Sequence, residues 1–98
     1  MVVTVLSLVD ACNTAHQGAV VYDALNNALA RHQIVSLDFS GVPNVTSSFV
    51  NTALLPLLAD FSFSELKIRL KISGTNRQIA NMIRDRLGKE SEKRSVAA

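Results

Sequence analysis

Three hydroxyl side chains, Thr46, Ser47 and Ser48, stand in a row in the segment LDFSGVPNVTSSF, which spans residues 37–49. The segment has the pattern of a strand end, a tight turn and the start of a helix. A serine hydroxyl at this place either caps the helix by accepting a backbone N–H or accepts a phosphate from a kinase. Capping by Ser47 or Ser48 explains one hydroxyl, with Thr46 as a β-branched residue that closes the loop, so both interpretations stay open.

The other side chains that could do chemistry are few and scattered. Cys12, His16 and His32 lack the spacing of metal ligands, so no metal site and no cofactor is expected. We expect Cys12 to be a buried thiol and both histidines to be ordinary residues at helix ends. Asp38 could act as a general base, but we expect it to accept amide groups of the glycine turn that follows it.

The usual enzymatic motifs are missing from the chain. It has no phosphate-binding G-x-x-x-x-G-K, no G-x-G-x-x-G, no G-x-S-x-G and no H-E-x-x-H. A small hydrolase that uses Asp38 with Ser47 would need a base that the sequence does not place nearby. We therefore expect a protein that is not an enzyme.

The length of 98 residues suits one domain. We expect a folded domain over residues 1–88 and a flexible polar C-terminal tail over residues 89–98. No stretch reaches the roughly 18 apolar residues of a membrane span. The sequence therefore predicts no membrane contact. The single Cys12 cannot form an internal disulfide, so the sequence also predicts a cytoplasmic protein.

Charge is distributed unevenly along the chain. Up to Leu66 one basic residue stands against five acidic ones, whereas nine basic residues stand against three acidic ones from Lys67 onward. Lys67, Arg69 and Lys71 form the most regular basic set, and we expect them to line one face of a strand. The sequence has only five aromatic residues on which bases could stack, which argues against recognition of single-stranded nucleic acid.

Apolar periodicity predicts three strands, over residues 2–9, 34–39 and 66–72. The first strand is nearly continuous in apolar residues, as expected for a strand buried on both faces. The third alternates apolar and charged residues without a break. These strands must position the hydroxyl segment, which follows the second of them.

Three helices are expected between and after the strands. A capping box at residues 14–17 precedes a helix of about four turns. Its apolar side is expected to consist of two rows, Val20, Ala24 and Ala28 beside Val21, Leu25 and Leu29. A second helix is expected over residues 48–59, with a kink or break at Pro56. A second capping box at residues 75–78 begins a helix over 75–87, and Gly88 is its expected stop.

The order is therefore β-α-β-α-β-α, which implies an α/β domain with a mainly parallel sheet. Because the third strand is charged on one side, we expect the helices chiefly on the other face. No internal repeat or linker is visible, so the sequence predicts a single domain.

The segment L-D-F-S-G-V-x-x-V-T-S-S-F resembles the centre of STAS-type domains, the bacterial anti-sigma-factor antagonists and their relatives. More closely than the antagonists, it resembles the STAS-like family of bacterial proteins that carry D-F-x-G-V-x-x-[IV]-[ST]-x-S-F. The resemblance implies a STAS-like fold from Gly18 through the last helix. In the antagonists, a partner kinase phosphorylates the serine that follows an aspartate, and that serine falls on Ser47 here. In this chain Thr46 occupies the position of the antagonists' aspartate, and Phe49 occupies the position of their glycine. Both departures bear on how a kinase would approach.

The resemblance implies a regulatory protein that binds a protein partner, either a histidine-kinase-like ATPase or a serine kinase. Phosphorylation would fall on Ser47 or Ser48. The expected contact surface surrounds the second helix and the loop before it, with an apolar patch at Phe49 and Leu55. Its residues are Asp38, Thr46, Ser47, Ser48, Phe49, Asn51 and Leu55.

A second function stays open beside this one. The basic last third could bind an acidic ligand or a nucleic acid through Lys67, Arg69 and Lys71. The sequence does not decide whether the chain forms a homodimer.

Overall fold

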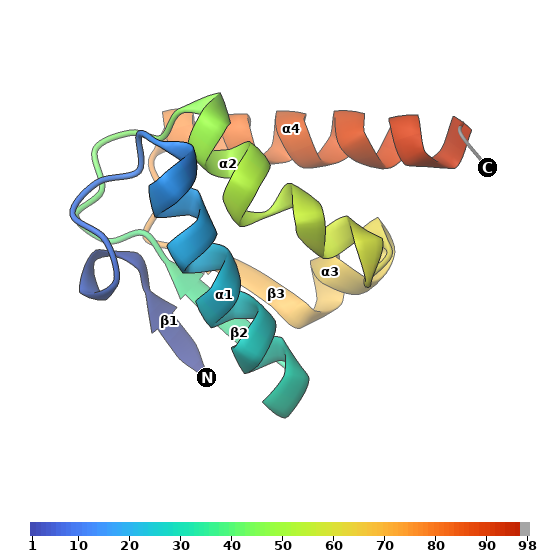
Figure 1. Cartoon of the computed structure of the whole chain (residues 1–98), viewed down its shortest axis with the longest axis horizontal. Helices are drawn as coiled ribbons and strands as arrows, with labels where there is room; N and C mark the ends of the chain where they lie inside the picture. Colours follow the sequence, from blue (N-terminus) through green and yellow to red (C-terminus); the bar gives the residue numbers. More distant parts are fainter. Residues whose placement is uncertain (97–98) are drawn as a thin grey trace.

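The computed structural model describes the backbone of residues 1–96 and the side chains of residues 1–94. Short strands alternate with helices along the chain (Figure 1). The strands are β1 (Val2–Thr4), β2 (Val35–Asp38) and β3 (Leu70–Ser73). The helices are α1 (Ala15–Arg31), α2 (Ser47–Ala53), α3 (Phe63–Arg69) and α4 (Arg77–Val96), with 3-10 turns η1 (Val5–Ser7) and η2 (Leu55–Ala59). Within the described residues, none of these helices combines the length and the apolar character that crossing a membrane requires.

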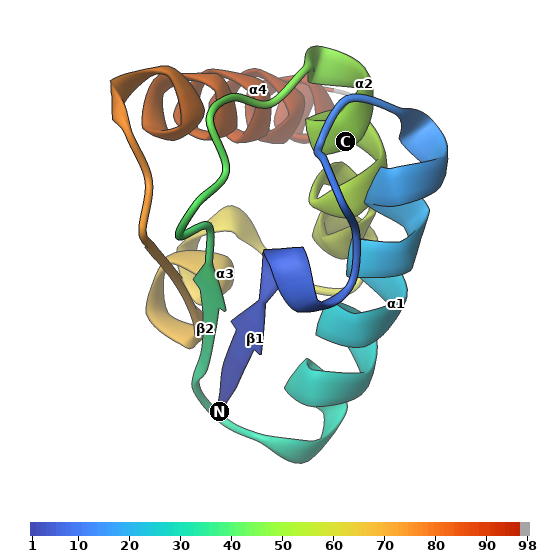
Figure 2. The ribbon, with the colours of Figure 1, turned by 90° about the vertical axis from the view of Figure 1, so that its left-hand side faces the viewer.

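The three strands form one parallel sheet in the order β1-β2-β3. Crossovers between parallel strands are nearly always right-handed, so connections that step in the same direction along a sheet lie on the same face. Figure 2 shows α1 and α2 together on one side of β1 and β2. The expected α/β fold, with a parallel sheet and helices chiefly on one face, is confirmed.

The two faces of the sheet have different surroundings. Val3 pairs in register with Leu37, and Leu37 with Ile72, on the face toward the helices. Val3 and Leu37 are buried. On the opposite face Thr4 is exposed and Asp38 is half-buried. The predicted strand over residues 2–9, buried on both sides, is therefore wrong. β1 is an edge strand that ends at Thr4, where the Ser7 hydroxyl donates to the Thr4 carbonyl and the chain turns into η1.

Helix α1 agrees with most of its sequence pattern, but of the predicted row Val20, Ala24 and Ala28 only Ala28 is buried, and Val20 is exposed. Thr14 accepts a hydrogen bond from the backbone of Gln17, and the Gln17 side chain accepts one from the backbone of Thr14, so the predicted capping box is confirmed. The buried side of α1 consists of Gly18, Val21, Leu25, Ala28 and Leu29. It packs against the sheet and against α2.

Gly18 sets the distance between α1 and α2. A Cβ atom at Gly18 would lie 2.6 Å from the Phe49 carbonyl oxygen and 2.9 Å from the Thr52 Cβ. The helices could accommodate it only by moving apart. Gly88, in the middle of α4, has nothing within 4 Å of the same position.

The substitution Gly18→Ala is expected to destabilise the fold by about 1–3 kcal/mol, because it overpacks the contact between α1 and α2. The control Gly88→Ala is expected to stabilise it by about 0.5–1 kcal/mol, because alanine is the better helix former. Urea unfolding of both variants measures the two effects. A shift in the same direction for both would contradict this role of Gly18.

The second helix is shorter than its sequence pattern suggests. The expected helix over residues 48–59 is divided into α2, which ends at Ala53, and the 3-10 turn η2. Pro56 lies in the first turn of η2, where the missing N–H costs least. The break expected at Pro56 is confirmed.

The third strand predicted over residues 66–72 is wrong in its first half. Residues 63–69 form α3, and the strand β3 begins only at Leu70. Ser62 caps α3 by accepting a hydrogen bond from the Glu65 backbone N–H at 3.0 Å. Capping and a Glu65–Arg69 ion pair of 3.6 Å, one turn apart, favour a helix over the alternating pattern.

Helix α4 does not stop at Gly88, so this prediction is also wrong. The helix continues to Val96. Lys89 pairs with Asp85 at 3.2 Å and Arg94 with Glu90 at 3.8 Å, each one turn apart. These pairs offset the cost of a glycine inside a helix. Most of the tail expected over 89–98 is thus helical, and residues 97–98 lie outside the described residues.

Candidate functional site

The loop between β2 and α2 ends at the hydroxyl triplet. On one side, this loop is hydrogen-bonded to the loop between β1 and α1. The Thr46 N–H donates to the Cys12 carbonyl at 3.1 Å. The Thr46 hydroxyl donates to the Asn13 carbonyl at 2.9 Å. The residues just before α1 and just before α2 are therefore tied to each other.

The beginning of α4 holds the same loop on its other side. The Gln78 side chain donates to the Val45 carbonyl at 3.0 Å and accepts from the Val45 N–H at 3.1 Å. The Asn76 side chain donates to the Pro43 carbonyl at 2.7 Å. Asn76 also caps α4 by accepting from the Ile79 N–H at 2.9 Å. The capping box predicted at residues 75–78 is therefore wrong, because Asn76 is the cap and Gln78 binds the loop instead.

In the hydroxyl triplet, one residue caps the helix and the other two are exposed. Thr46 caps α2 by accepting from the Phe49 N–H at 3.2 Å, so the interpretation that Ser47 or Ser48 is the cap is wrong. Ser47 and Ser48 form the first turn of α2 and are both exposed. Neither hydroxyl makes a hydrogen bond to any part of the chain that the structure describes. The first turn of α2 thus carries two adjacent, exposed hydroxyl groups.

Phe49 and Leu55 do not form the expected apolar patch. Phe49 is fully buried and Leu55 is 7% exposed. With Thr46 as the cap, the buried side of α2 consists of Phe49, Val50 and Ala53, which face the core. Both residues therefore stabilise the fold and do not line an exposed surface.

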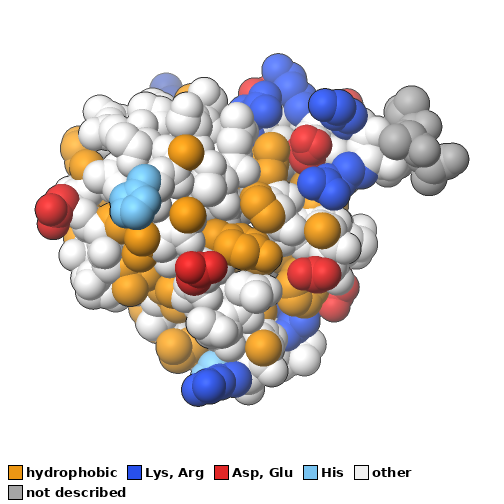
Figure 3. All heavy atoms as spheres, in the orientation of Figure 1, with side chains coloured by type: hydrophobic (Ala, Val, Ile, Leu, Met, Phe, Trp, Pro, Cys, Tyr) orange, Lys and Arg blue, Asp and Glu red, His pale blue; other side chains and the backbone are white. Residues whose placement is uncertain are grey.

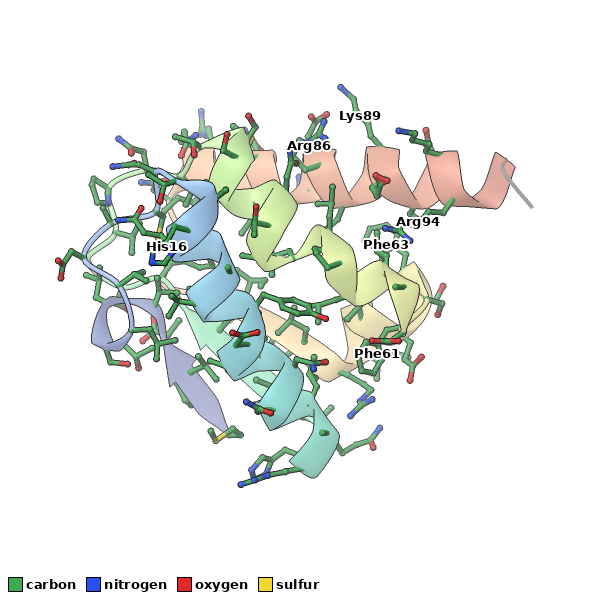
Figure 4. All side chains as sticks on the ribbon, in the orientation of Figure 1. His16, Phe61, Phe63, Arg86, Lys89 and Arg94 are labelled. Atoms are coloured by element: carbon green, nitrogen blue, oxygen red, sulfur yellow. The ribbon has the colours of Figure 1, made fainter. Side chains whose placement is uncertain are left out.

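Asn51 remains on the exposed surface of α2, one helical turn beyond Ser47. The Arg86 guanidinium of α4 donates to the Asn51 side-chain oxygen at 2.9 Å. Figure 4 shows Arg86 on the side of α4 next to α2. The contact places a cation on the side of α2 that carries Ser47 and Asn51, which are four residues apart.

Asp38 lies at the carboxyl end of β2, on the uncovered face of the sheet. Its carboxylate accepts from the Ser40 hydroxyl at 2.6 Å and from the Ser40 N–H at 2.9 Å. These bonds hold the pKa of Asp38 below its usual value. The expectation that Asp38 accepts an amide of the following turn is confirmed. The turn approaches Gly74 closely, and Gly74 adopts a φ of 66° there.

The remaining reactive side chains stand apart from one another. Cys12 is 1% exposed, and burial raises its pKa to about 11, so its thiol stays protonated at neutral pH. His16 and His32 lie exposed near the two ends of α1. Among the residues that the structure describes, no three His, Cys, Asp or Glu side chains lie close enough together to hold a metal ion.

The basic set predicted on one strand face is divided between two elements. Lys67 and Arg69 belong to α3, and only Lys71 belongs to β3. Arg69 donates to the carbonyl oxygens of Leu29 at 2.6 Å, Gln33 at 3.0 Å and His32 at 3.1 Å. It therefore caps the C-terminal end of α1 and is a structural residue, so the prediction that it lines a basic binding face is wrong.

The sequence reasoning missed the surroundings of Phe63. The Lys67 ammonium lies 4.6 Å from the centre of the Phe63 ring, and both side chains line a hollow between α3 and α4. Most of the remaining Lys and Arg side chains gather over α4 (Figure 3). Once residues 63–69 are read as a helix, the i,i+4 spacing of Phe63 and Lys67 is the signal that could have found this pair.

Comparison with known families gives one finding. The family model described as a STAS-like domain of unknown function (DUF4325) matches residues 17–80, from α1 to the first turn of α4. The matched part includes the hydroxyl triplet and the loop before it. No curated protein and no solved structure matches the chain.

Proposed function

Because the chain belongs to the family of STAS-like domains of unknown function, we propose that it is a non-enzymatic regulatory module that binds a protein partner. The binding surface consists of the exposed residues Ser47, Ser48 and Asn51 together with the loop before α2. The observation that carries the proposal is the exposure of both serine hydroxyls beside a loop that is hydrogen-bonded on two sides.

The rigidity of this surface supports a role in binding. Thr46 ties the loop to the β1–α1 loop, and Asn76 and Gln78 tie it to α4. A surface that is ordered before a partner arrives loses less conformational entropy on binding. The partner can therefore recognise two hydroxyl groups and one amide that stand next to a hydrogen-bonded loop.

The partner is a histidine-kinase-like ATPase or a serine kinase that modifies Ser47 or Ser48. The serine hydroxyl attacks the γ-phosphorus of ATP, the bond to the β-phosphate oxygen breaks, and ADP leaves. A base of the kinase receives the hydroxyl proton. The phosphate adds a charge of about −1.5 to −2 to a surface that carried none on these side chains, and the bound partner loses its complementary surface.

Arg86 supports this choice of site. Its guanidinium lies against Asn51, on the same side of α2 as Ser47. A phosphate on Ser47 would give Arg86 an anionic acceptor in place of the neutral Asn51 amide. The modified protein can therefore keep its fold while its surface changes.

Phosphate mapping tests the switch. Trypsin releases residues 32–67 as one peptide, since no Lys or Arg lies between Arg31 and Lys67. In protein purified from the native host, tandem mass spectrometry is expected to find phosphate on Ser47 or Ser48. Ser62 and Ser64 in the same peptide serve as internal controls. An unmodified peptide under every growth condition, or phosphate on the control serines alone, would contradict the switch.

A second candidate function, binding of an acidic ligand through the basic C-terminal third, has one observation in its favour. Several Lys and Arg side chains lie over α4 on the face that Figure 3 shows. Arg69 is excluded from such a site because it caps α1. Lys67 remains available to it beside Phe63.

A further inference from the structure

Two hollows lie between α4 and the segment η2–α3, on either side of Phe63. The first, of about 400 Å³, is lined among others by Phe63, Lys67, Ile72, Ile83 and Arg84. The second, of about 370 Å³, is lined by Leu58, Ser62, Phe63, Ser64, Ser91 and Arg94. The aromatic ring of Phe63 is a wall of both. In Figure 4, Arg94 points from α4 toward Phe63.

The spacing of the α4 residues makes the two hollows parts of one groove. Ala80, Arg84, Ser91 and Arg94 line the hollows and recur at intervals that keep them on one side of a helix. From residue 80 to residue 94 the helix rises about 21 Å, at 1.5 Å per residue. An extended peptide covers that length with about six residues, at roughly 3.3 Å each. The groove therefore has the length of a peptide segment.

The chemistry of the groove is apolar at its base and cationic at its rim. Ile72 and Ile83 supply apolar surface in the first hollow, and Leu58 supplies it in the second. Lys67 and Arg84 flank the first hollow, and Arg94 flanks the second. Among the side chains that the structure describes, no Asp or Glu lines either hollow.

The cations beside the first hollow are available to a ligand. Within the part of the chain that the structure describes, Lys67 and Arg84 form no ion pair. Lys67 lies over the Phe63 ring, which holds its ammonium group at the edge of the hollow. A ligand with carboxylates would find two uncompensated positive charges beside an aromatic side chain.

We propose that this groove binds an extended acidic segment of a partner protein. One apolar side chain of the segment packs beside Phe63 in the first hollow, and carboxylates on either side of it pair with Lys67 and Arg84. The charge of the rim selects the acidic segment, and the apolar base selects the anchor. The groove shares no residue with the surface around Ser47, so it is a second binding site.

Binding of a fluorescein-labelled peptide, Glu-Asp-Asp-Leu-Glu-Asp, tests the proposal by fluorescence anisotropy. Saturable binding is expected, and the peptide Gln-Asn-Asn-Leu-Gln-Asn is expected to bind at least about tenfold more weakly because it lacks the carboxylates. The substitution Arg84→Gln is expected to weaken binding about fivefold or more. Lys93→Gln, an exposed change on α4 that lines neither hollow, is expected to leave the affinity within about twofold.

Amide chemical shifts of the labelled chain locate the peptide. The largest changes are expected at residues 63–67, 72, 80–84 and 91–94, with residues 47–51 unaffected. Failure of this site would thus leave the proposed role of Ser47 and Ser48 intact. Equal binding of both peptides, no saturation, or equal effects of Arg84→Gln and Lys93→Gln would overturn the proposal. Stronger binding of a DNA duplex with shifts spread over all of α4 would also overturn it, in favour of a nucleic-acid surface.

Discussion

The substitution Phe49→Ala is expected to destabilise the fold by about 3–5 kcal/mol, the range for removing a large aromatic side chain from a packed core. Phe49 is fully buried, and its carbonyl group lies against Gly18 of α1. The substitution leaves a cavity where α1 and α2 meet the sheet. A domain of this size has a total stability of about 5–15 kcal/mol, so the variant should unfold at much lower urea concentration.

Ser48→Ala is the matched control for Phe49→Ala, one residue earlier on the same helix. Ser48 is exposed, so its truncation is expected to change stability by no more than about 0.5 kcal/mol. Urea unfolding followed by circular dichroism measures both variants. A stable Phe49→Ala protein would show that this ring lies at the surface and would restore the apolar patch expected from the sequence.

The substitution Arg69→Met is expected to destabilise the fold by about 2–4 kcal/mol, because it leaves carbonyl groups at the end of α1 without their charged donor. The guanidinium donates to three carbonyl oxygens, those of Leu29, His32 and Gln33. It also lies 5.0 Å from the centre of the Phe61 ring. Methionine keeps the apolar stem and removes all of these polar contacts.

Two further variants, Arg69→Lys and Lys71→Met, distinguish the hydrogen-bond geometry of the Arg69 guanidinium from the effect of its positive charge alone. Lysine keeps the positive charge but cannot reach three carbonyl groups with a planar fork, so Arg69→Lys is expected to lose about half of the same free energy. Lys71 is exposed and makes one bond of 3.3 Å, so Lys71→Met is expected to be nearly neutral. Equal losses of unfolding free energy for Arg69→Met and Lys71→Met would refute the capping role of Arg69.

The elements that sequence reasoning found are those whose signals are local. The capping box at Thr14 and Gln17 and the buried row Val21, Leu25 and Leu29 depend only on residues within α1. The break at Pro56 likewise depends on one residue and its missing N–H. The parallel sheet followed from the alternation of strands and helices, since parallel strands need crossovers.

The elements that sequence reasoning missed are those where local signals compete. Residues 66–72 alternate like a strand, but Ser62 caps a helix and Arg69 reaches the end of α1, a contact between residues far apart in the chain. Asn76 and Gln78 show the same effect, because Gln78 binds Val45 across the fold instead of closing a capping box. Long-range contacts of this kind leave no periodic pattern in the sequence.

The candidate site was predicted only in part for a related reason. The hydroxyl triplet and its position at the start of a helix were visible in the sequence. Which hydroxyl caps the helix depends on the loop geometry. Because α2 is capped at Thr46, Phe49 lies on the side of α2 that faces the core. The groove beside Phe63 was invisible because it forms between α3 and α4, and α3 itself was missed.

Photocrosslinking from α2 tests the central claim, that the surface around Ser47 and Ser48 binds a protein partner. The photoreactive residue p-benzoylphenylalanine replaces Ser48 in one variant and the exposed Asn26 of α1 in a matched control. After irradiation in cells of the native host, the variant at position 48 is expected to give one discrete adduct, which Ser47→Glu reduces. No adduct at position 48, or the same adducts from both positions, would contradict the claim.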